Sequence, residues 1–289
     1  MGFDSFANSR AGISTALAVS RVLPPAVGHG IARVVARRLA ADRSSEMVRQ
    51  IRANQWVVSG KTLSAEELDE AVQEVLTNSG YALYDLYHPG RRAEAIVKGV
   101  RTDAVFERIL TTPGPIVYAG CHLGNFDIAG QALAFSGWQA QVMTVPNPHG
   151  GYESQNAIRE DSGLEVTPVC LESLRRASRR LADGGVVVTG LDRPIPEPEA
   201  SLTFFGEPAP LPLLHARLAM RAKAPVVVVA APRREDGTYQ ILASEPIEMQ
   251  DKDATANAAR VLAVAEEFIA AYSRQWVMPH AVWPHVKAP

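Results

Sequence analysis

The stretch Pro115-Ile116-Val117-Tyr118-Ala119-Gly120-Cys121-His122 opens with an apolar, β-branched run that follows a Pro-Gly pair. A short run of this kind behind turn residues predicts a buried strand. Comparable runs occur at 141–145, 186–189 and 226–229, and helical patterns lie between and after them at 171–181, 212–223 and 254–273. Nearly continuous apolar strands that alternate with helices are typical of a sheet covered on both faces. The sequence therefore predicts an α/β fold with a mostly parallel sheet, to which 238–243 adds an antiparallel edge strand.

The first 90 residues have a different pattern and predict an N-terminal amphipathic helical arm (1–90) ahead of an α/β domain (91–289). Ser64 and Glu67 match a capping box at the start of a long helix, and another helix is expected around 97–110. Apolar residues at helical spacing, with three arginines beside them, occur at Val27, Ile31, Val34, Val35 and Leu39. Two interpretations stay open for this stripe: it lies in the headgroup region of an anionic membrane, or it packs on the protein's own core.

Composition excludes several classes of protein. The 289 residues contain 29 Lys and Arg against 31 Asp and Glu, which gives a formal net charge of −2. Proteins that bind nucleic acid usually carry a basic excess, so no nucleic-acid partner is predicted. Two cysteines are too few for a disulfide framework or a cysteine-based zinc site, and no metal site is predicted. The chain has no run of 18 apolar residues and no secretory signal, so we expect an intracellular protein, soluble or on a membrane surface.

A candidate catalytic pair follows the first strand. His122 comes just past its carboxyl end, where open α/β sheets place ligands, and Asp127 lies five residues later in the next helix. A tight turn through Gly124 would bring the Asp127 carboxylate onto one imidazole nitrogen. The other nitrogen would then be free to take a proton from a hydroxyl group. As bare spacing the pair is weak evidence, because such a pair is more often an ordinary structural contact.

Several further motifs accompany this pair in a fixed order. They are Arg21–Pro24, Arg49–Asn54, Gly120–Asp127, Asn156–Gly163, Gly190–Pro194, Phe204–Ala209, Ala216–Pro225 and Arg274–His280. The ordered set resembles the bacterial lipid A late acyltransferase superfamily, which includes the phosphatidylinositol mannoside acyltransferases. The similarity runs from about residue 20 to the C-terminus. The Asp192-Arg193 pair is closest to the mannoside branch, although Pro194 departs from that branch's pattern.

The resemblance implies roles for individual residues. His122 matches the family's catalytic base, Asp127 its orienting carboxylate, and Arg159 an arginine in the active-site groove. Asp192 matches an acidic residue beside the reacting centre. The expected substrate-binding residues are Gly124, Asn125, Arg193, Phe204 and Phe205. Backbone amides near Gly124, or the Arg159 guanidinium, are the candidates for stabilising an oxyanion. His149, His215, His280 and His285 match no catalytic motif.

The predicted function is transfer of a fatty acyl group from acyl-CoA or acyl-carrier protein to a hydroxyl of a glycolipid or lysolipid. No cofactor is required beyond this thioester co-substrate. The enzyme is expected to be peripheral, on the cytoplasmic face of the cell membrane, and a monomer is favoured. A groove that mixes Arg159, Arg193 and the pair Arg175-Arg176 with acidic residues predicts an acceptor with few charges. The alternative is a non-catalytic lipid-binding protein on an acyltransferase-like scaffold. Neither a Gly-x-Ser-x-Gly elbow nor a Gly-x-Gly-x-x-Gly motif occurs, which argues against serine hydrolases and dinucleotide enzymes.

Overall fold

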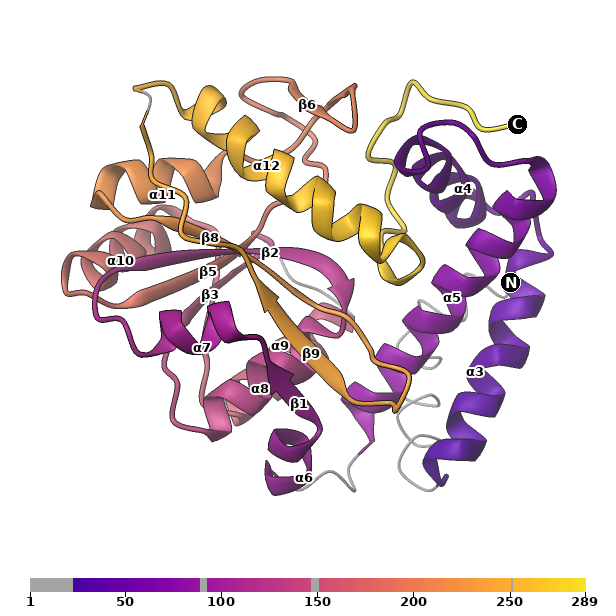
Figure 1. Ribbon diagram of the computed structural model, residues 1–289, viewed down its shortest axis with the longest axis horizontal. Helices are drawn as coiled ribbons and strands as arrows, with labels where there is room; N and C mark the ends of the chain where they lie inside the picture. Colours follow the sequence, from indigo (N-terminus) through magenta and orange to yellow (C-terminus); the bar gives the residue numbers. More distant parts are fainter. Residues whose placement is uncertain (1–22, 89–92, 147–150, 251) are drawn as a thin grey trace.

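The computed structural model describes residues 23–88, 93–146, 151–250 and 252–289, and a seven-stranded sheet lies at its centre (Figure 1). The strand order is β1-β9-β8-β2-β5-β3-β4, and β8 and β9 are the antiparallel neighbours in it. A separate hairpin joins β6 and β7. The strand bounds are β1 Val100–Thr102, β2 Ile116–Gly124, β3 Gln141–Thr144, β4 Glu165–Pro168, β5 Val186–Gly190, β6 Leu202–Phe204, β7 Glu207–Ala209, β8 Val226–Ala231 and β9 Tyr239–Ala243.

Helices cover both faces of the sheet, as the apolar strands predict. Their bounds are α3 Pro25–Ala40, α4 Glu46–Val58, α5 Ala65–Tyr87, α6 Ala93–Lys98, α7 Ala104–Leu110, α8 Phe126–Phe135, α9 Gly151–Asp161, α10 Leu171–Ala182, α11 Leu214–Ala222 and α12 Ala254–Ala271. Along β2, Val117, Ala119 and Cys121 face the core shared with α10, α11 and α12, whereas Tyr118 faces the core shared with α7 and α8. This alternation has the period of two that a strand buried on both faces requires. The α/β prediction is confirmed.

Two details of the predicted order are wrong. Strand β9 is not at the edge, because β1 pairs with it in parallel and lies outside it. The single helix expected around 97–110 is split by β1 into α6 and α7. Asp103 explains the second start: its side chain accepts a hydrogen bond from the Phe106 amide and caps α7. The sequence analysis did not predict β4, whose residues Glu-Val-Thr-Pro do not form an apolar run.

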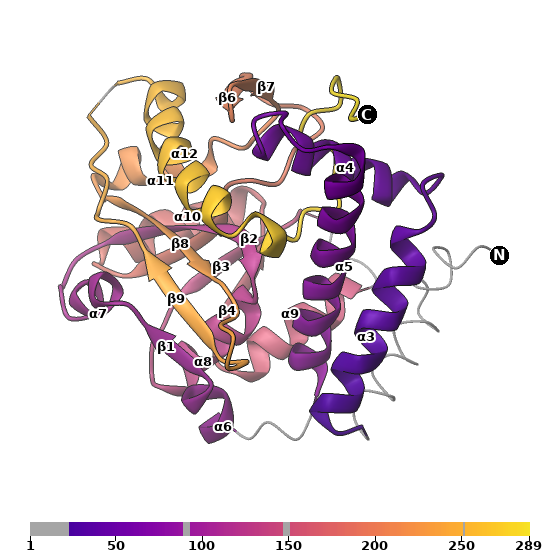
Figure 2. The ribbon, with the colours of Figure 1, turned by 45° about the vertical axis from the view of Figure 1, so that its right-hand side comes forward.

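The N-terminal helices α3, α4 and α5 pack beside the sheet (Figure 2). The capping box on Ser64 and Glu67 is confirmed, with both reciprocal hydrogen bonds present. Helix α3 lies tightly against α5 because Gly28 has no side chain; a Cβ there would be 2.1 Å from a Tyr84 ring carbon. Helix α4 contributes Val57 and Val58 to the main core. The arm is therefore packed onto the α/β unit over two of its three described helices.

Part of the apolar stripe on α3 packs on the protein's own core, and part of it is exposed, as membrane contact would require. Leu39 packs on the small core between α3, α4 and α5. Val27, Ile31 and Val34 remain 46%, 42% and 57% exposed. The earlier helical pattern, up to residue 22, lies outside the described residues. Among the helices that the structure describes, none combines the length and the apolar character needed to cross a bilayer.

Candidate active site

His122 and Asp192 form the central pair of the site. They lie at the carboxyl edge of two neighbouring strands, because β2 and β5 pair in parallel with Gly120 opposite Gly190. Each residue comes two positions after its glycine, so the register places the two side chains together. His122 Nδ1 is 2.6 Å from Asp192 Oδ1, and the His122 amide donates to Asp192 Oδ2 at 2.8 Å. Since a carboxylate accepts hydrogen bonds, Nδ1 carries the proton and Nε2 is the basic nitrogen of the ring.

Trp276 completes the environment of this carboxylate. Its indole Nε1 donates to Asp192 Oδ2 at 2.8 Å, and Asp192 itself is fully buried. Burial raises the pKa of Asp192, but the adjacent His122 and the hydrogen bonds from His122 and Trp276 outweigh it and hold the pKa below its usual value. Asp192 is therefore a charged, fully hydrogen-bonded partner. The sequence reading quoted Trp276 within a motif but gave it no role.

Asp127 lies elsewhere than expected. Its Oδ1 accepts from Arg159 Nε at 2.6 Å, and both side chains are about nine-tenths buried. The expectation that Asp127 binds an imidazole nitrogen of His122 is wrong for Nδ1, which Asp192 occupies. The physical reason is that β2 continues past His122 to Gly124, where the chain turns into α8. Asp127 then lies in the first turn of α8 and faces Arg159 on α9.

The turn between β2 and α8 depends on Gly124 and Asn125. Gly124 has φ of +71°, and a Cβ there would be 1.9 Å from the Ala231 carbonyl oxygen, so only glycine fits. Asn125 caps α8 by accepting from the Ile128 amide, and its Nδ2 donates to the Ala82 carbonyl of α5 at 3.0 Å. The Asn125 side chain is buried and makes both of these hydrogen bonds within the protein, and its expected contact with substrate stays a prediction. Its amide also donates to Ala231, which leaves it unable to stabilise an oxyanion.

Phe126 contacts both polar pairs. Its ring meets His122 edge-to-face with 5.3 Å between centroids, and the Arg159 guanidinium carbon lies 5.8 Å from the ring centroid. Phe126 is nevertheless 38% exposed. Tyr87 on α5 lies near the Asp127–Arg159 pair. Burial, and next the charge of Asp127, raise the pKa of its phenol. An accessible aromatic ring beside His122 suits an apolar substrate.

His280 lies close enough to both His122 and Arg193 for their charges to interact. The Arg193 guanidinium stacks on Tyr152 of α9, 5.0 Å from the ring centroid, and also hydrogen-bonds the Tyr152 hydroxyl. Burial lowers the pKa of His280 to about 4, and Arg193 and His122 add to this effect. The C-terminal segment is fixed in place, since Val277 donates its amide to the His122 carbonyl and Asn54 donates to the His280 carbonyl.

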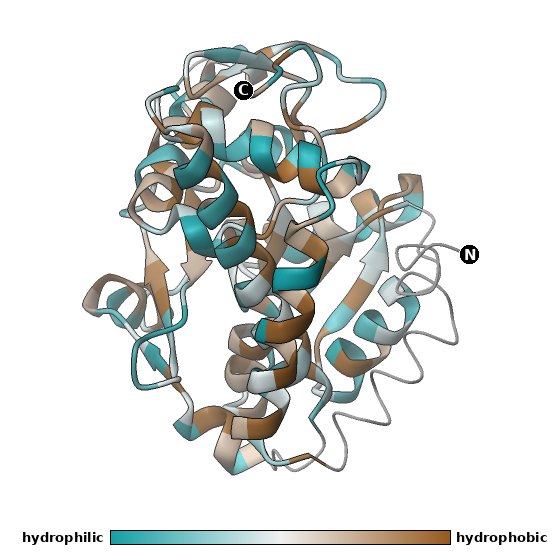
Figure 3. Cartoon of the chain, turned by 90° about the vertical axis from the view of Figure 1, so that its right-hand side faces the viewer, coloured by the Kyte–Doolittle hydropathy of each residue, from teal (hydrophilic) through white to brown (hydrophobic). Residues whose placement is uncertain are grey.

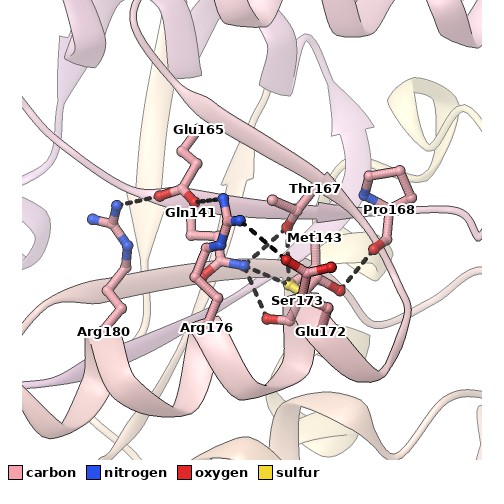
Figure 4. A network of polar contacts seen from close by, with 9 residues as sticks. All are labelled: Gln141, Met143, Glu165, Thr167, Pro168, Glu172, Ser173, Arg176 and Arg180. Carbon is pink, nitrogen blue, oxygen red and sulfur yellow. Dashed lines mark hydrogen bonds and ion pairs between the residues drawn. The ribbon is translucent and has the colours of Figure 1, made fainter.

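Other expected groove residues lie outside the site. Phe204 is fully buried in the core and stacks on Trp283, so it does not line the groove as expected, while its neighbour Phe205 is only half-buried. Arg176 points toward Glu165 on β4 and also lies near Glu172, within a network between α10 and the strands β3 and β4 (Figure 4). It belongs to the surface of α10. His149 lies outside the described residues.

The arrangement suits proton transfer at a hydroxyl group. His122 offers Nε2 on a ring whose side chain is 28% exposed, and Asp192 fixes its tautomer and stabilises the imidazolium form. Cys121 is no competing nucleophile: burial, and next the Asp192 charge, raise the pKa of its thiol well above the usual value. Within the described ranges, no group of three or more His, Cys, Asp and Glu side chains is placed to hold a metal ion.

Comparison of the sequence with known protein families identifies the family of this chain. The model of the bacterial lipid A biosynthesis acyltransferase family matches residues 11–285, which is nearly the whole chain. No curated protein matched the sequence. The matched range includes both strands that carry His122 and Asp192, the α8 and α9 helices, and Trp276. The chain therefore belongs to the bacterial lipid A biosynthesis acyltransferase family, and it is an enzyme that transfers acyl groups to lipid.

Proposed function

We propose that His122 is the general base of a direct acyl transfer from a thioester to a lipid hydroxyl. Nε2 takes the hydroxyl proton as the oxygen attacks the thioester carbonyl. The C–O bond forms, the C–S bond breaks, and the proton passes from His122 to the leaving thiolate. The observation that carries the proposal is the buried Asp192 carboxylate, 2.6 Å from Nδ1, which holds the ring in the tautomer that a base needs.

The Asp127–Arg159 pair has a separate role in this proposal. Arg159 donates hydrogen bonds from Nε to Asp127 and from Nη1 to Asn156. A guanidinium has five N–H groups, so further donors remain. Phe126 contacts both Arg159 and His122, so Arg159 lies about one aromatic ring from the base. We assign the remaining N–H groups of Arg159 to the tetrahedral oxyanion or the carbonyl of the donor. Asp127 orients Arg159 and offsets its charge.

The acceptor proposed is a glycolipid or lysolipid with few charges. Of the arginines placed near His122, Arg159 is paired with the Asp127 carboxylate, whereas Arg193 stacks on the neutral Tyr152 ring and keeps its charge unbalanced. A multiply phosphorylated acceptor would need unpaired cations to balance its charge. The mannoside-type acceptor suggested by Asp192-Arg193 fits this requirement. The donor is acyl-CoA or acyl-carrier protein.

The proposed location is the membrane surface, reached through the N-terminal arm. Val27, Ile31 and Val34 form one exposed apolar stripe on α3, with Arg38 inside the stripe and Arg33 and Arg37 along its flank. Such a helix suits the boundary between headgroups and acyl chains. The side of the membrane stays a prediction, with the cytoplasmic face expected, as does the division into an arm at 1–90 and a domain at 91–289.

Acyl transfer in a defined mixture tests the proposal. The wild-type protein is incubated with labelled acyl-CoA, or with acyl-carrier protein, and total bacterial membrane lipids, and the acylated lipid is identified by mass spectrometry. We expect His122→Ala to abolish both transfer and slow thioester hydrolysis while keeping the melting temperature. Equal turnover in wild type and His122→Ala would refute the base assignment. A multiply phosphorylated disaccharide product would refute the proposed acceptor class alone.

The same assay separates the enzyme from the alternative of a lipid-binding protein. A binding protein would retain lipid in both the wild type and His122→Ala and would consume thioester in neither. Family membership and the intact His122–Asp192 pair favour the enzyme. A matched control is His285→Ala, because His285 is an exposed histidine that contacts Glu207 away from His122. We expect this control to transfer acyl groups at the wild-type rate.

A further inference from the structure

A cavity of about 260 Å³ lies between helices α3 and α5, away from His122. We call it the α3–α5 groove. It is lined by Arg33, Arg37, Gln73, Glu74, Thr77 and Asn78. Arg33 and Arg37 are four residues apart on α3, so their side chains extend along the same side of the helix. The remaining four residues are polar and come from consecutive turns of α5. The groove thus presents two guanidinium groups beside hydroxyl and amide groups.

The positive charge of the groove is not used by the protein. In the part of the chain that the structure describes, neither Arg33 nor Arg37 forms an ion pair; Arg33 makes a long hydrogen bond of 3.4 Å to the Tyr81 hydroxyl. The carboxylate of Glu74 lies 3.5 Å from Arg274 Nε, so its charge is partly balanced from outside the groove. Two exposed cations without an ion-pair partner among the described residues, in a polar cavity, are complementary to an anion.

The surroundings of the groove point to a lipid rather than a soluble anion. An exposed apolar stripe lies next to the groove on α3 and consists of Val27, Ile31 and Val34. At 100° per residue, this stripe is about a quarter turn or slightly more around the helix from Arg33 and Arg37. Figure 3 looks onto the side formed by α3, α4 and α5, where hydrophobic and hydrophilic segments alternate along the helices. A phosphate in the groove would place these valines and the isoleucine at the level of the acyl chains.

We propose that the α3–α5 groove binds the phosphate of an anionic lipid headgroup and docks the chain on the membrane in one orientation. Helix α5 joins this site to the catalytic one. Thr77 lines the groove, and Ala82, about 7.5 Å further along the helix, accepts a hydrogen bond from Asn125 beside His122. Docking through the groove therefore fixes the height of the catalytic edge above the lipid surface. The proposal rests on the proposed action on membrane lipid.

The experiment measures binding to vesicles by co-sedimentation. Phosphatidylcholine vesicles with and without phosphatidylglycerol are compared for the wild type, for Arg33→Gln/Arg37→Gln, and for Arg179→Gln/Arg221→Gln. The last pair removes the same charge from exposed positions on α10 and α11, which lie on the opposite side of the molecule from α3 (Figure 1). An arginine at an anionic surface contributes about 1 kcal/mol, so the groove variant should bind the anionic vesicles about 30-fold more weakly. The control pair should change binding by less than about threefold.

Equal weakening by the two double variants would overturn the proposal, because it would show general charge attraction rather than a site. Unchanged binding of the groove variant would overturn it as well. Inorganic phosphate and soluble glycerophosphoglycerol, added as competitors, separate a phosphate site from attraction to the charged surface, and we expect both to displace the wild type. His122→Ala should bind the vesicles like the wild type. A wild type that docks through the groove but transfers no acyl group would refute the proposed function and leave the site standing.

Discussion

Replacing Asp192 by Asn tests the catalytic pair most directly, because the structure dictates how the new side chain must lie. Oδ2 accepts hydrogen bonds from the His122 amide and from Trp276 Nε1, both of which are donors only. The carbonyl oxygen of Asn must take that position, which turns its NH2 group toward His122 Nδ1. Nδ1 must then accept a hydrogen bond, and the ring proton moves to Nε2. The base nitrogen is thereby blocked.

The magnitude follows from this change of tautomer. General-base catalysis contributes about 10²- to 10⁴-fold, and the same exchange in Ser-His-Asp triads costs about 10⁴-fold in kcat. We expect Asp192→Asn to lower kcat by about 10³-fold or more, which corresponds to about 4 kcal/mol of transition-state stabilisation. KM should hardly change, because Asp192 is fully buried and does not reach substrate. The melting temperature should also hold, since the amide keeps the shape of the carboxyl group.

The assay is steady-state transfer across a range of pH, with the fold checked by circular dichroism. The defect of Asp192→Asn should persist over the whole range, high pH included, because the blocked tautomer is neutral. Turnover within about tenfold of the wild type would refute the reasoning, because that loss is below the usual contribution of general-base catalysis. A large loss that appeared in KM alone would place Asp192 in binding instead.

Three other outcomes are expected. Asp127→Asn should lower the free energy of unfolding by about 3 kcal/mol in urea denaturation, because it leaves the buried Arg159 guanidinium without its counter-charge; an unchanged midpoint would contradict this. Phe126→Ala should lower kcat by up to about tenfold, since an edge-to-face pair contributes about 0.5–1.5 kcal/mol, and Phe126→Trp should restore most of it. Burial lowers the pKa of His215 from 6.5 to about 4. The neutral, buried ring therefore makes its full contribution to the free energy of unfolding above pH 6.5, and this contribution is lost as the pH falls toward 4. At pH 5 the loss is about 2 kcal/mol, and thermal unfolding of His215→Leu should be less sensitive to acid between these limits.

The sequence predicted the fold well wherever a strand is long and apolar. Runs such as 186–189 and 226–229 became β5 and β8 with nearly the expected bounds. The errors concern short elements whose state is decided by their neighbours. β1 has three residues and forms because β9 offers it an open edge, and Phe204 is buried because Trp283 stacks on it from the far end of the chain. No local pattern reports such contacts.

His122 was expected just past the end of a strand and next to Asp127; it lies inside β2, and its Nδ1 bonds Asp192 instead. The signal for the correct partner was present. His122 and Asp192 each come two residues after one of the paired glycines Gly120 and Gly190, so the parallel register of β2 and β5 places them side by side. Using it requires knowing that β2 and β5 are neighbours, although about 70 residues separate them. Spacing along the chain favoured Asp127, and only the strand order shows that it faces α9.

The two carboxylates near His122 differ in what their charge can do during the reaction. Asp127 is already balanced by Arg159, so the pair is neutral before any proton moves. Asp192 has around it the neutral donors of the His122 amide, the ring Nδ1 and Trp276, and its negative charge becomes balanced only when His122 gains a proton. A charge that forms beside a buried, preorganised countercharge is stabilised far more than in water. In the proposed mechanism, Asp192 is therefore the one of these two acids whose charge favours the transition state over the resting state, which is the property that catalysis requires.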